Sequence, residues 1–248
     1  MADNVRRSPL ADYAAAARRP RYSLLFALPL LVLYEVSSFA LSGSAYEGVR
    51  NGADVLLKQL FVSFGGANGL ALFNLLLLGA GGVLIWSDIS RHPGPLKPRV
   101  FLLMLAESTL YALLFGAVVG RLTSLLLQIG GGSLDLPTQL VVSLGAGIYE
   151  ELLFRVLLTG GLASVLRTAA GMKPVPAAAV AVLVSALIFS AFHYIGRFGD
   201  DFTLASFTYR AIAGVLFSIM YVTRGLGITA WTHALYDLLV TMLYAGSR

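Results

Sequence analysis

Residues 22–41 read YSLLFALPLLVLYEVSSFAL, an apolar run in which Glu35 is the single acidic or basic side chain. A helix of about 20 apolar residues is long enough to cross the hydrocarbon core of a bilayer. The stretch therefore predicts a transmembrane helix. Whether the whole chain is a membrane protein depends on whether the same pattern recurs.

The composition of the whole chain is also strongly apolar and poor in charge. Of its 248 residues, 57% are apolar and 12% are charged, and the mean hydropathy is +0.79. Soluble domains carry about 25% charged residues, because their surface has to be wetted. The composition excludes a soluble globular protein, a disordered chain and a nucleic-acid-binding domain. It predicts an all-α, polytopic bundle of transmembrane helices embedded in the lipid bilayer.

Seven stretches are long and apolar enough to be spans. They are residues 22–41, 67–87, 101–127, 138–165, 176–196, 204–223 and 227–245. The shorter stretch from Ala53 to Phe64 predicts an interfacial or re-entrant helix, and a count of eight spans that includes it is the alternative. Residues 1–21 predict a cytoplasmic tail, and residues 22–248 a single membrane domain.

Lys and Arg residues gather on one side of this seven-span arrangement. The N-terminal tail and the loops at 91–99 and 171–176 share that side, so the positive-inside rule predicts a cytoplasmic N-terminus. The net charge of +5 is thus a topology signal, and no nucleic-acid partner is expected. The absence of cysteine excludes a disulfide framework and a cysteine nucleophile. Richness in Ala, Gly, Leu and Arg favours a bacterial origin, and hence the cytoplasmic (inner) membrane.

Ionisable side chains inside the predicted spans are few. Each needs a reason, because one charge at the bilayer centre costs about 2.5–3.5 kcal/mol on insertion scales. They are Glu35, Glu107, Arg121, Glu150, Glu151, Arg155, His193, Arg210, His233 and Asp237. Most of them form three compact clusters in the C-terminal half, which favours a functional site there.

The first cluster lies at residues 149–155, YEELLFR. On an α-helix Glu151 and Arg155 are one turn apart with the acid first, the favourable order for an ion pair. Glu150 points about 140° away from Arg155. We therefore expect a structural pair and one free carboxylate, which in a low-dielectric pocket can act as a general base. The alternative for Glu150 is a structural pair that joins helices.

The second and third clusters are FSAFH at 189–193 and HALYD at 233–237. His233 and Asp237 share one helix face at i, i+4 spacing. A single buried histidine is more often a packing residue than a catalyst. His193 and His233 lie on separate spans together with a spare glutamate, and this combination favours a functional site.

The three clusters resemble the motifs of a known family. Glu-Glu-x-x-x-Arg at 150–155, Phe-x-x-x-His at 189–193 and His-x-x-x-Asp at 233–237, in this order on hydrophobic spans, look like those of the CPBP family. This family comprises the type II CAAX prenyl endopeptidases and the bacteriocin-processing or immunity proteins, also called the Abi family. The resemblance covers about residues 100–245. It implies an intramembrane endopeptidase whose partner is a peptide or protein substrate at the membrane.

The resemblance also implies roles for individual residues: water activation by Glu150 and His193, oxyanion stabilisation by His233 and Asp237, and support of the site by Glu151 and Arg155. Prenyl-processing members usually have Asn at the last of these positions, so CAAX specificity stays open for this chain. A carboxylate donates to an oxyanion only when it is protonated. Orienting His233, or binding a metal, is therefore the alternative role of Asp237.

Other mechanisms and functions use the same residues. No cofactor is expected, although Glu150, His193, His233 and Asp237 would also suit Zn²⁺. No His-Glu-x-x-His segment supports zinc, and the family resemblance implies metal-free, glutamate-activated water. A proton-coupled transporter and a catalytically silent immunity-type protein are the alternative functions, and the sequence carries no inverted repeat typical of transporters. Nothing in it signals an oligomeric state.

Two expectations concern geometry. In straight, vertical helices Glu150, His193 and His233 would differ in depth by about 10–15 Å, so one shared site requires tilted helices or shifted span ends.

Glu35 and Glu107 have no cation nearby in the sequence. We expect them to line the same cavity, to stay protonated, or to pair with Arg210 or Arg121. We expect the side chain of Arg210 to extend to the membrane interface.

Overall fold

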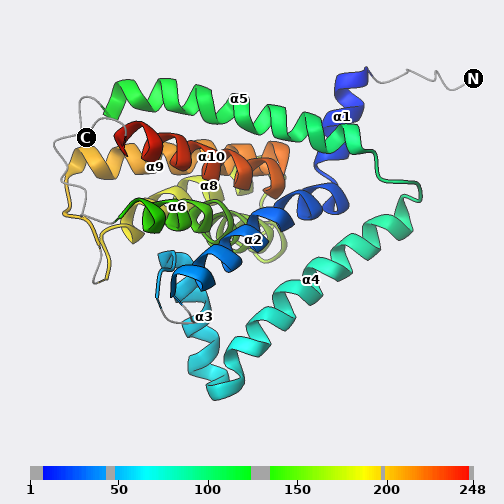
Figure 1. The fold of residues 1–248 in the computed structure, drawn as a ribbon. Coiled ribbons are helices and arrows are strands. Elements are labelled where there is room, and N and C mark those ends of the chain that lie inside the picture. Colours follow the sequence, from blue (N-terminus) through cyan, green and yellow to red (C-terminus); the bar gives the residue numbers. More distant parts are fainter. Residues whose placement is uncertain (1–7, 43–47, 124–134, 197–198, 246–248) are drawn as a thin grey trace, which may run out of the picture.

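The structure is a computed structural model that describes residues 8–42, 48–123, 135–196 and 199–245, and every regular element in these ranges is helical (Figure 1). The elements are α1 (Pro9–Ala17), α2 (Pro20–Ser42), α3 (Gly52–Gly65), η1 (Gly66–Asn68), α4 (Gly69–Arg91), α5 (Pro98–Thr123), α6 (Leu136–Gly145), η2 (Ala146–Gly160), α7 (Gly161–Thr168), α8 (Pro174–Phe192), α9 (Leu204–Arg224) and α10 (Leu226–Ala245). The predicted all-helical bundle is confirmed.

Within the described ranges, six helical stretches are long and apolar enough to cross a membrane. They are Pro20–Ser42, Gly52–Arg91, Pro98–Ala117, Pro174–Phe192, Leu204–Arg224 and Leu226–Leu243. Each overlaps one of the seven predicted spans. The remaining prediction, 138–165, is also helical but is divided among α6, η2 and α7. The chain is an integral membrane protein by the length and composition of its helices.

Proline and glycine set several of the helix boundaries. The first residue of α1, α2, α5 and α8 is a proline, whose missing N–H leaves no hydrogen bond unmade at that position. Between α3 and α4 the chain turns at Gly66, whose φ of 52° lies in the left-handed region that glycine adopts without strain. The short helix predicted over 53–64 is α3, and α4 leaves it at a sharp angle (Figure 1).

The segment η2 differs from the α-helix that the sequence predicted. It is a π-helix of 15 residues, and the Thr159 hydroxyl donates to the carbonyl of Phe154, five residues earlier, at 2.8 Å. Such wide helices are rare and often occur at functional sites. Since η2 packs against α3, α8, α9 and α10, it forms the centre of the bundle and carries the first motif.

Candidate active site

The three motif segments meet around η2. The first motif lies on η2, the second at the end of α8 and the third on α10, and η2 packs against both of these helices. The Phe189 ring lies between the two histidines, with centroid distances of 4.8 Å to His193 and 6.4 Å to His233. Glu150 interacts electrostatically with both histidines. The three motifs therefore lie close together in the fold.

One physical reason is the position of the end of α8. The predicted span ran to 196, whereas the helix ends at Phe192 and His193 is its C-cap residue. A second reason is a close approach of η2 to α10 at Gly147. A Cβ atom at Gly147 would lie 2.5 Å from the Cβ of Ala234 and 2.7 Å from the carbonyl oxygen of Ala230. Because glycine has no Cβ, the first motif can come this close to the helix that carries His233.

Glu151 lies between two cationic partners. Its Oε1 is 2.7 Å from Nδ1 of His233, and its Oε2 is 3.2 Å from Nε of Arg155. Glu151 and Arg155 are both 0% exposed. The Arg155 guanidinium also lies over the rings of Phe189 and Phe217, at 4.6 and 5.7 Å from their centroids. A buried charge persists only when it is paired, so this arrangement holds η2 and α10 together.

His233 faces a carboxylate on each side of its ring. Besides Glu151 at Nδ1, Asp237 Oδ2 lies 3.5 Å from Nε2. A neutral imidazole carries one N–H and an imidazolium carries two, so two flanking carboxylates favour the charged form. A separation of 3.5 Å is long for a hydrogen bond. Consequently the Nε2–H of His233 is oriented by Asp237 yet stays free to be donated elsewhere.

The tautomer of His193 follows from its contact with the backbone. Its Nδ1 lies 2.9 Å from the carbonyl oxygen of Phe189, and a carbonyl only accepts hydrogen bonds. Nδ1 therefore carries the proton, and Nε2 of the neutral ring is an acceptor. The backbone N–H of Asp200 donates to the carbonyl of His193 at 2.9 Å.

Glu150 has a different environment from its neighbour. It is 7% exposed, and its Oε1 accepts a hydrogen bond of 2.9 Å from Nδ2 of Asn51. Asn51 caps α3, and sequence reasoning did not place it in the site. An Asn just before a helical stretch signals an N-cap, but no local pattern connects it with a glutamate 99 residues away.

The alternative of a metal site concerns the same four side chains. In the part of the chain that the structure describes, no group of three or more His, Cys, Asp or Glu side chains is arranged to hold a metal ion. Of the proposed ligands, His233 has a carboxylate at each ring nitrogen.

The two other acids of the predicted spans, Glu35 and Glu107, have partners that the sequence did not predict. Glu35 pairs with Arg50 at 2.8 Å and with Lys58 at 2.9 Å, and it accepts a hydrogen bond from the Tyr149 hydroxyl at 2.5 Å. Both cations also contact Asp54, at 2.9 and 2.7 Å. Arg50, Asp54 and Lys58 lie in or next to α3. The sequence did not predict that this helix packs against the first span.

Glu107 also has a partner distant in the chain. It binds Arg224 at 2.6 Å and accepts a hydrogen bond from the Tyr13 hydroxyl at 2.5 Å. Arg210 binds Asp200 and the Tyr194 hydroxyl, so the expected pairing of Glu35 or Glu107 with Arg210 was wrong. The side chain of Arg121 lies outside the described residues.

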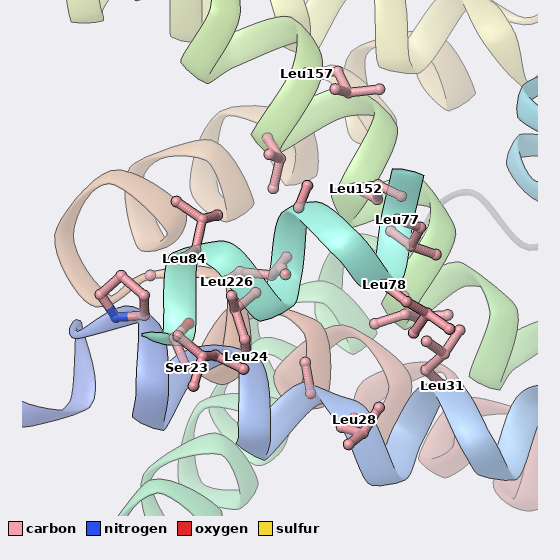
Figure 2. A pocket seen from close by; sticks show the side chains of 18 of the residues that line it. Ser23, Leu24, Leu28, Leu31, Leu77, Leu78, Leu84, Leu152, Leu157 and Leu226 are labelled. Atoms are coloured by element: carbon pink, nitrogen blue, oxygen red, sulfur yellow. The ribbon is translucent and has the colours of Figure 1, made fainter. Parts of the chain in front are cut away.

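A large apolar groove lies on another face of η2 (Figure 2). Its volume is about 860 Å³, and it extends between α2, α4 and η2. Figure 2 shows that leucines of all three helices line it, among them Leu24, Leu28, Leu31, Leu77, Leu84 and Leu152. Tyr149 is part of its wall, whereas the next residue, Glu150, contacts Asn51 of the site.

The structure thus places a buried site of Glu and His side chains inside a helical membrane protein. Residues 132–239, which hold all three motifs, match the family model described as Type II CAAX prenyl endopeptidase Rce1-like. This match confirms the resemblance found in the motifs and supports a membrane endopeptidase of the CAAX type. No curated protein and no solved structure matches the chain. Asn51 and the groove helices α2 and α4 lie outside the matched segment.

Proposed function

We propose that this chain is an intramembrane endopeptidase that cleaves a membrane-associated peptide or protein with a water molecule activated by Glu150 and His193. The observation that carries the proposal is the contrast between two adjacent carboxylates. Glu151 is neutralised by Arg155 and His233, whereas the hydrogen-bond partner of Glu150, in the described part of the chain, is the neutral amide of Asn51. A negative charge without a bonded cation, beside two histidines, is suited to general base catalysis.

The proposed reaction is a direct attack by water. The Glu150 carboxylate takes one proton as the water oxygen bonds to the carbonyl carbon, and Nε2 of His193 accepts a hydrogen bond from the O–H that stays on that oxygen. The Nε2–H of His233 donates to the developing oxyanion, while Glu151 and Asp237 balance the charge of its ring. When the C–N bond breaks, the proton held by Glu150 passes to the leaving amine. No Ser or Cys nucleophile is required.

The apolar groove supports a substrate that is partly embedded in the membrane. Its aliphatic lining and its volume of about 860 Å³ suit a lipid anchor or an apolar peptide segment. We propose that the groove holds this part of the substrate, whether or not it is prenylated. The distribution of Lys and Arg supports action in a bacterial cytoplasmic membrane, with the N-terminus on the cytoplasmic side.

The decisive experiment uses purified protein in proteoliposomes with fluorogenic peptides. Glu150→Gln and His193→Ala are each expected to abolish cleavage while the protein still inserts and unfolds at nearly the wild-type temperature. His92→Ala is the matched control, because His92 lies in the loop after α4 with its side chain 49% exposed. Cleavage at the wild-type rate by Glu150→Gln would refute the mechanism.

Metal dependence is tested separately. Cleavage is expected to survive exhaustive chelation, because both ring nitrogens of His233 face carboxylates. Complete loss of activity after chelation, restored by zinc alone, would show that the metal-free mechanism is wrong.

A further inference from the structure

Asn51 is the one side chain from the first hundred residues that hydrogen-bonds to a proposed catalytic group within the described ranges. Its side chain makes two contacts that together fix the amide. Oδ1 accepts a hydrogen bond from the backbone N–H of Ala53 at 2.9 Å, and Nδ2 donates to Oε1 of Glu150 at 2.9 Å. Because a backbone N–H can only donate, Oδ1 must face Ala53 and the NH₂ group must face Glu150.

The backbone of Asn51 is held as firmly as its side chain. Its N–H donates to the Tyr34 hydroxyl at 3.0 Å, and that hydroxyl donates to Asp54 Oδ2 at 2.7 Å. Asp54 is in turn bound by Arg50 and Lys58. Asn51 is 3% exposed and Tyr34 is 0% exposed. The ion-pair cluster around α3 therefore fixes the point from which the amide reaches η2.

A glycine on α6 makes this approach possible. A Cβ atom at Gly145 would lie 2.6 Å from the Cβ of Asn51 and 2.5 Å from Cε2 of Tyr34. Distances under 3.0 Å are not tolerated between such atoms without displacement. The helix that leads into the first motif thus leaves room for Asn51 beside Glu150.

We infer that Asn51 is a positioning residue for Glu150: its amide holds Oε1, so that Oε2 is directed to the water. This inference rests on the proposed role of Glu150 as the general base. A carboxylate held by one neutral donor keeps its charge and a fixed orientation, and it has no hydrogen-bonded cation to weaken it as a base. The amide of Asn51, the N-cap of α3, thereby completes the site from outside the segment that matches the family model.

The substitution Asn51→Asp separates positioning from capping. Asp is as good an N-cap as Asn, so the hydrogen bond from Ala53 is retained. The group facing Glu150, however, changes from a donor to a carboxylate. We expect kcat to fall on the order of 10- to 100-fold, as for a misplaced catalytic group, with KM within about twofold of the wild type. Asn68→Asp is the matched control, because Asn68 precedes α4, is exposed and makes no side-chain cap hydrogen bond.

A second measurement does not depend on activity. Asn51→Asp is expected to lower the thermal unfolding temperature in detergent, because two carboxylates then face each other. Combining it with Glu150→Gln reverses donor and acceptor across the same contact, and the double variant is expected to regain the lost unfolding temperature. Failure of the double variant to regain it would overturn the inference.

The remaining outcomes are also decisive. Wild-type kcat in Asn51→Asp, or a proportional change of kcat and KM, would show that Asn51 has no positioning role. If the wild-type protein cleaves no substrate, the proposed function is what fails. The unfolding cycle then decides by itself whether Asn51 holds Glu150.

Discussion

Glu150 and Glu151 are adjacent in the chain but serve different purposes. The carboxylate of Glu151 is fully buried between Arg155 and His233, and its charge is used to hold these two groups. The carboxylate of Glu150 is bound by the amide of Asn51. This difference in hydrogen-bond partner is the reason for proposing Glu150, rather than Glu151, as the general base.

Replacing Glu151 tests its structural role. Glu151→Gln leaves two buried cationic groups without their carboxylate, and the loss of one partner from a buried pair costs about 3–5 kcal/mol. We expect a decrease of this size in the free energy of unfolding, measured by denaturant titration in detergent micelles. Glu107→Gln is the control, because the side chains of Glu107 and Arg224 are 16% and 15% exposed. Equal losses in the two variants would contradict the role of Glu151.

At the scale of elements, the site depends on how closely η2 approaches α10. The motif residues of η2 reach His233 because Gly147 packs directly on the backbone and side chain of α10. The π-helical hydrogen bonding of η2 changes the face on which its residues lie, yet Arg155 and Glu151 remain in contact at 3.2 Å. The tight contact between the two helices is therefore the feature that brings the first and third motifs together.

A methyl group tests this contact. Gly147→Ala places a Cβ against Ala234 and the carbonyl of Ala230. Overpacking of this kind costs about 1–3 kcal/mol, and we expect both the unfolding free energy and cleavage to decrease. Gly161→Ala is the control, since nothing lies within 4 Å of a Cβ there. It is expected to be neutral or to stabilise the helix by about 0.5–1 kcal/mol. Full activity in Gly147→Ala would show that the close approach is not required.

At the scale of the whole molecule, α4 stands apart from the rest of the bundle and forms the groove with α2 and η2 (Figure 1). The wall that the groove shares with the site is η2, where Tyr149 faces the groove and is bound to Glu35. The molecule thus has an apolar groove beside a polar interior site. This arrangement suits a substrate with an apolar part and a cleavable peptide part.

Filling the groove tests whether it binds substrate. Gly82 lines the groove, and nothing lies within 4 Å of a Cβ placed there, so Gly82→Leu adds a side chain that starts in open space. We expect KM for a lipid-anchored or apolar peptide to rise roughly tenfold, equivalent to about 1.4 kcal/mol of binding free energy. KM for a short soluble peptide is expected to stay unchanged.

Gly79→Leu is the control on the same helix. A Cβ placed at Gly79 would also have nothing within 4 Å, but Gly79 is not part of the groove lining. Both substrates should be cleaved with wild-type KM by this variant. An equal effect of Gly79→Leu and Gly82→Leu would exclude the groove as the binding surface.

The sequence by itself determined the features that depend on local spacing. Runs of apolar residues predicted the spans, because crossing a bilayer requires only a sufficient apolar length. The order of the three motifs predicted the family resemblance, and the i, i+4 spacing predicted the pair between Glu151 and Arg155. The loops predicted at 91–99 and 171–176 lie where α4 ends at Arg91 and where α8 begins at Pro174.

Only the tertiary structure decided which distant segments share the site. The contact between Asn51 and Glu150 joins residues 99 positions apart, and that between Glu151 and His233 joins residues 82 positions apart. The cations that bind Glu35, the end of α8 before His193 and the groove between α2 and α4 likewise depend on packing. Helix propensity and apolar length act within one segment, whereas the partner of a buried charge is set by the crossing and close approach of helices. For that reason the sequence indicated which residues carry the chemistry, and the fold selected the groups that hold them in place.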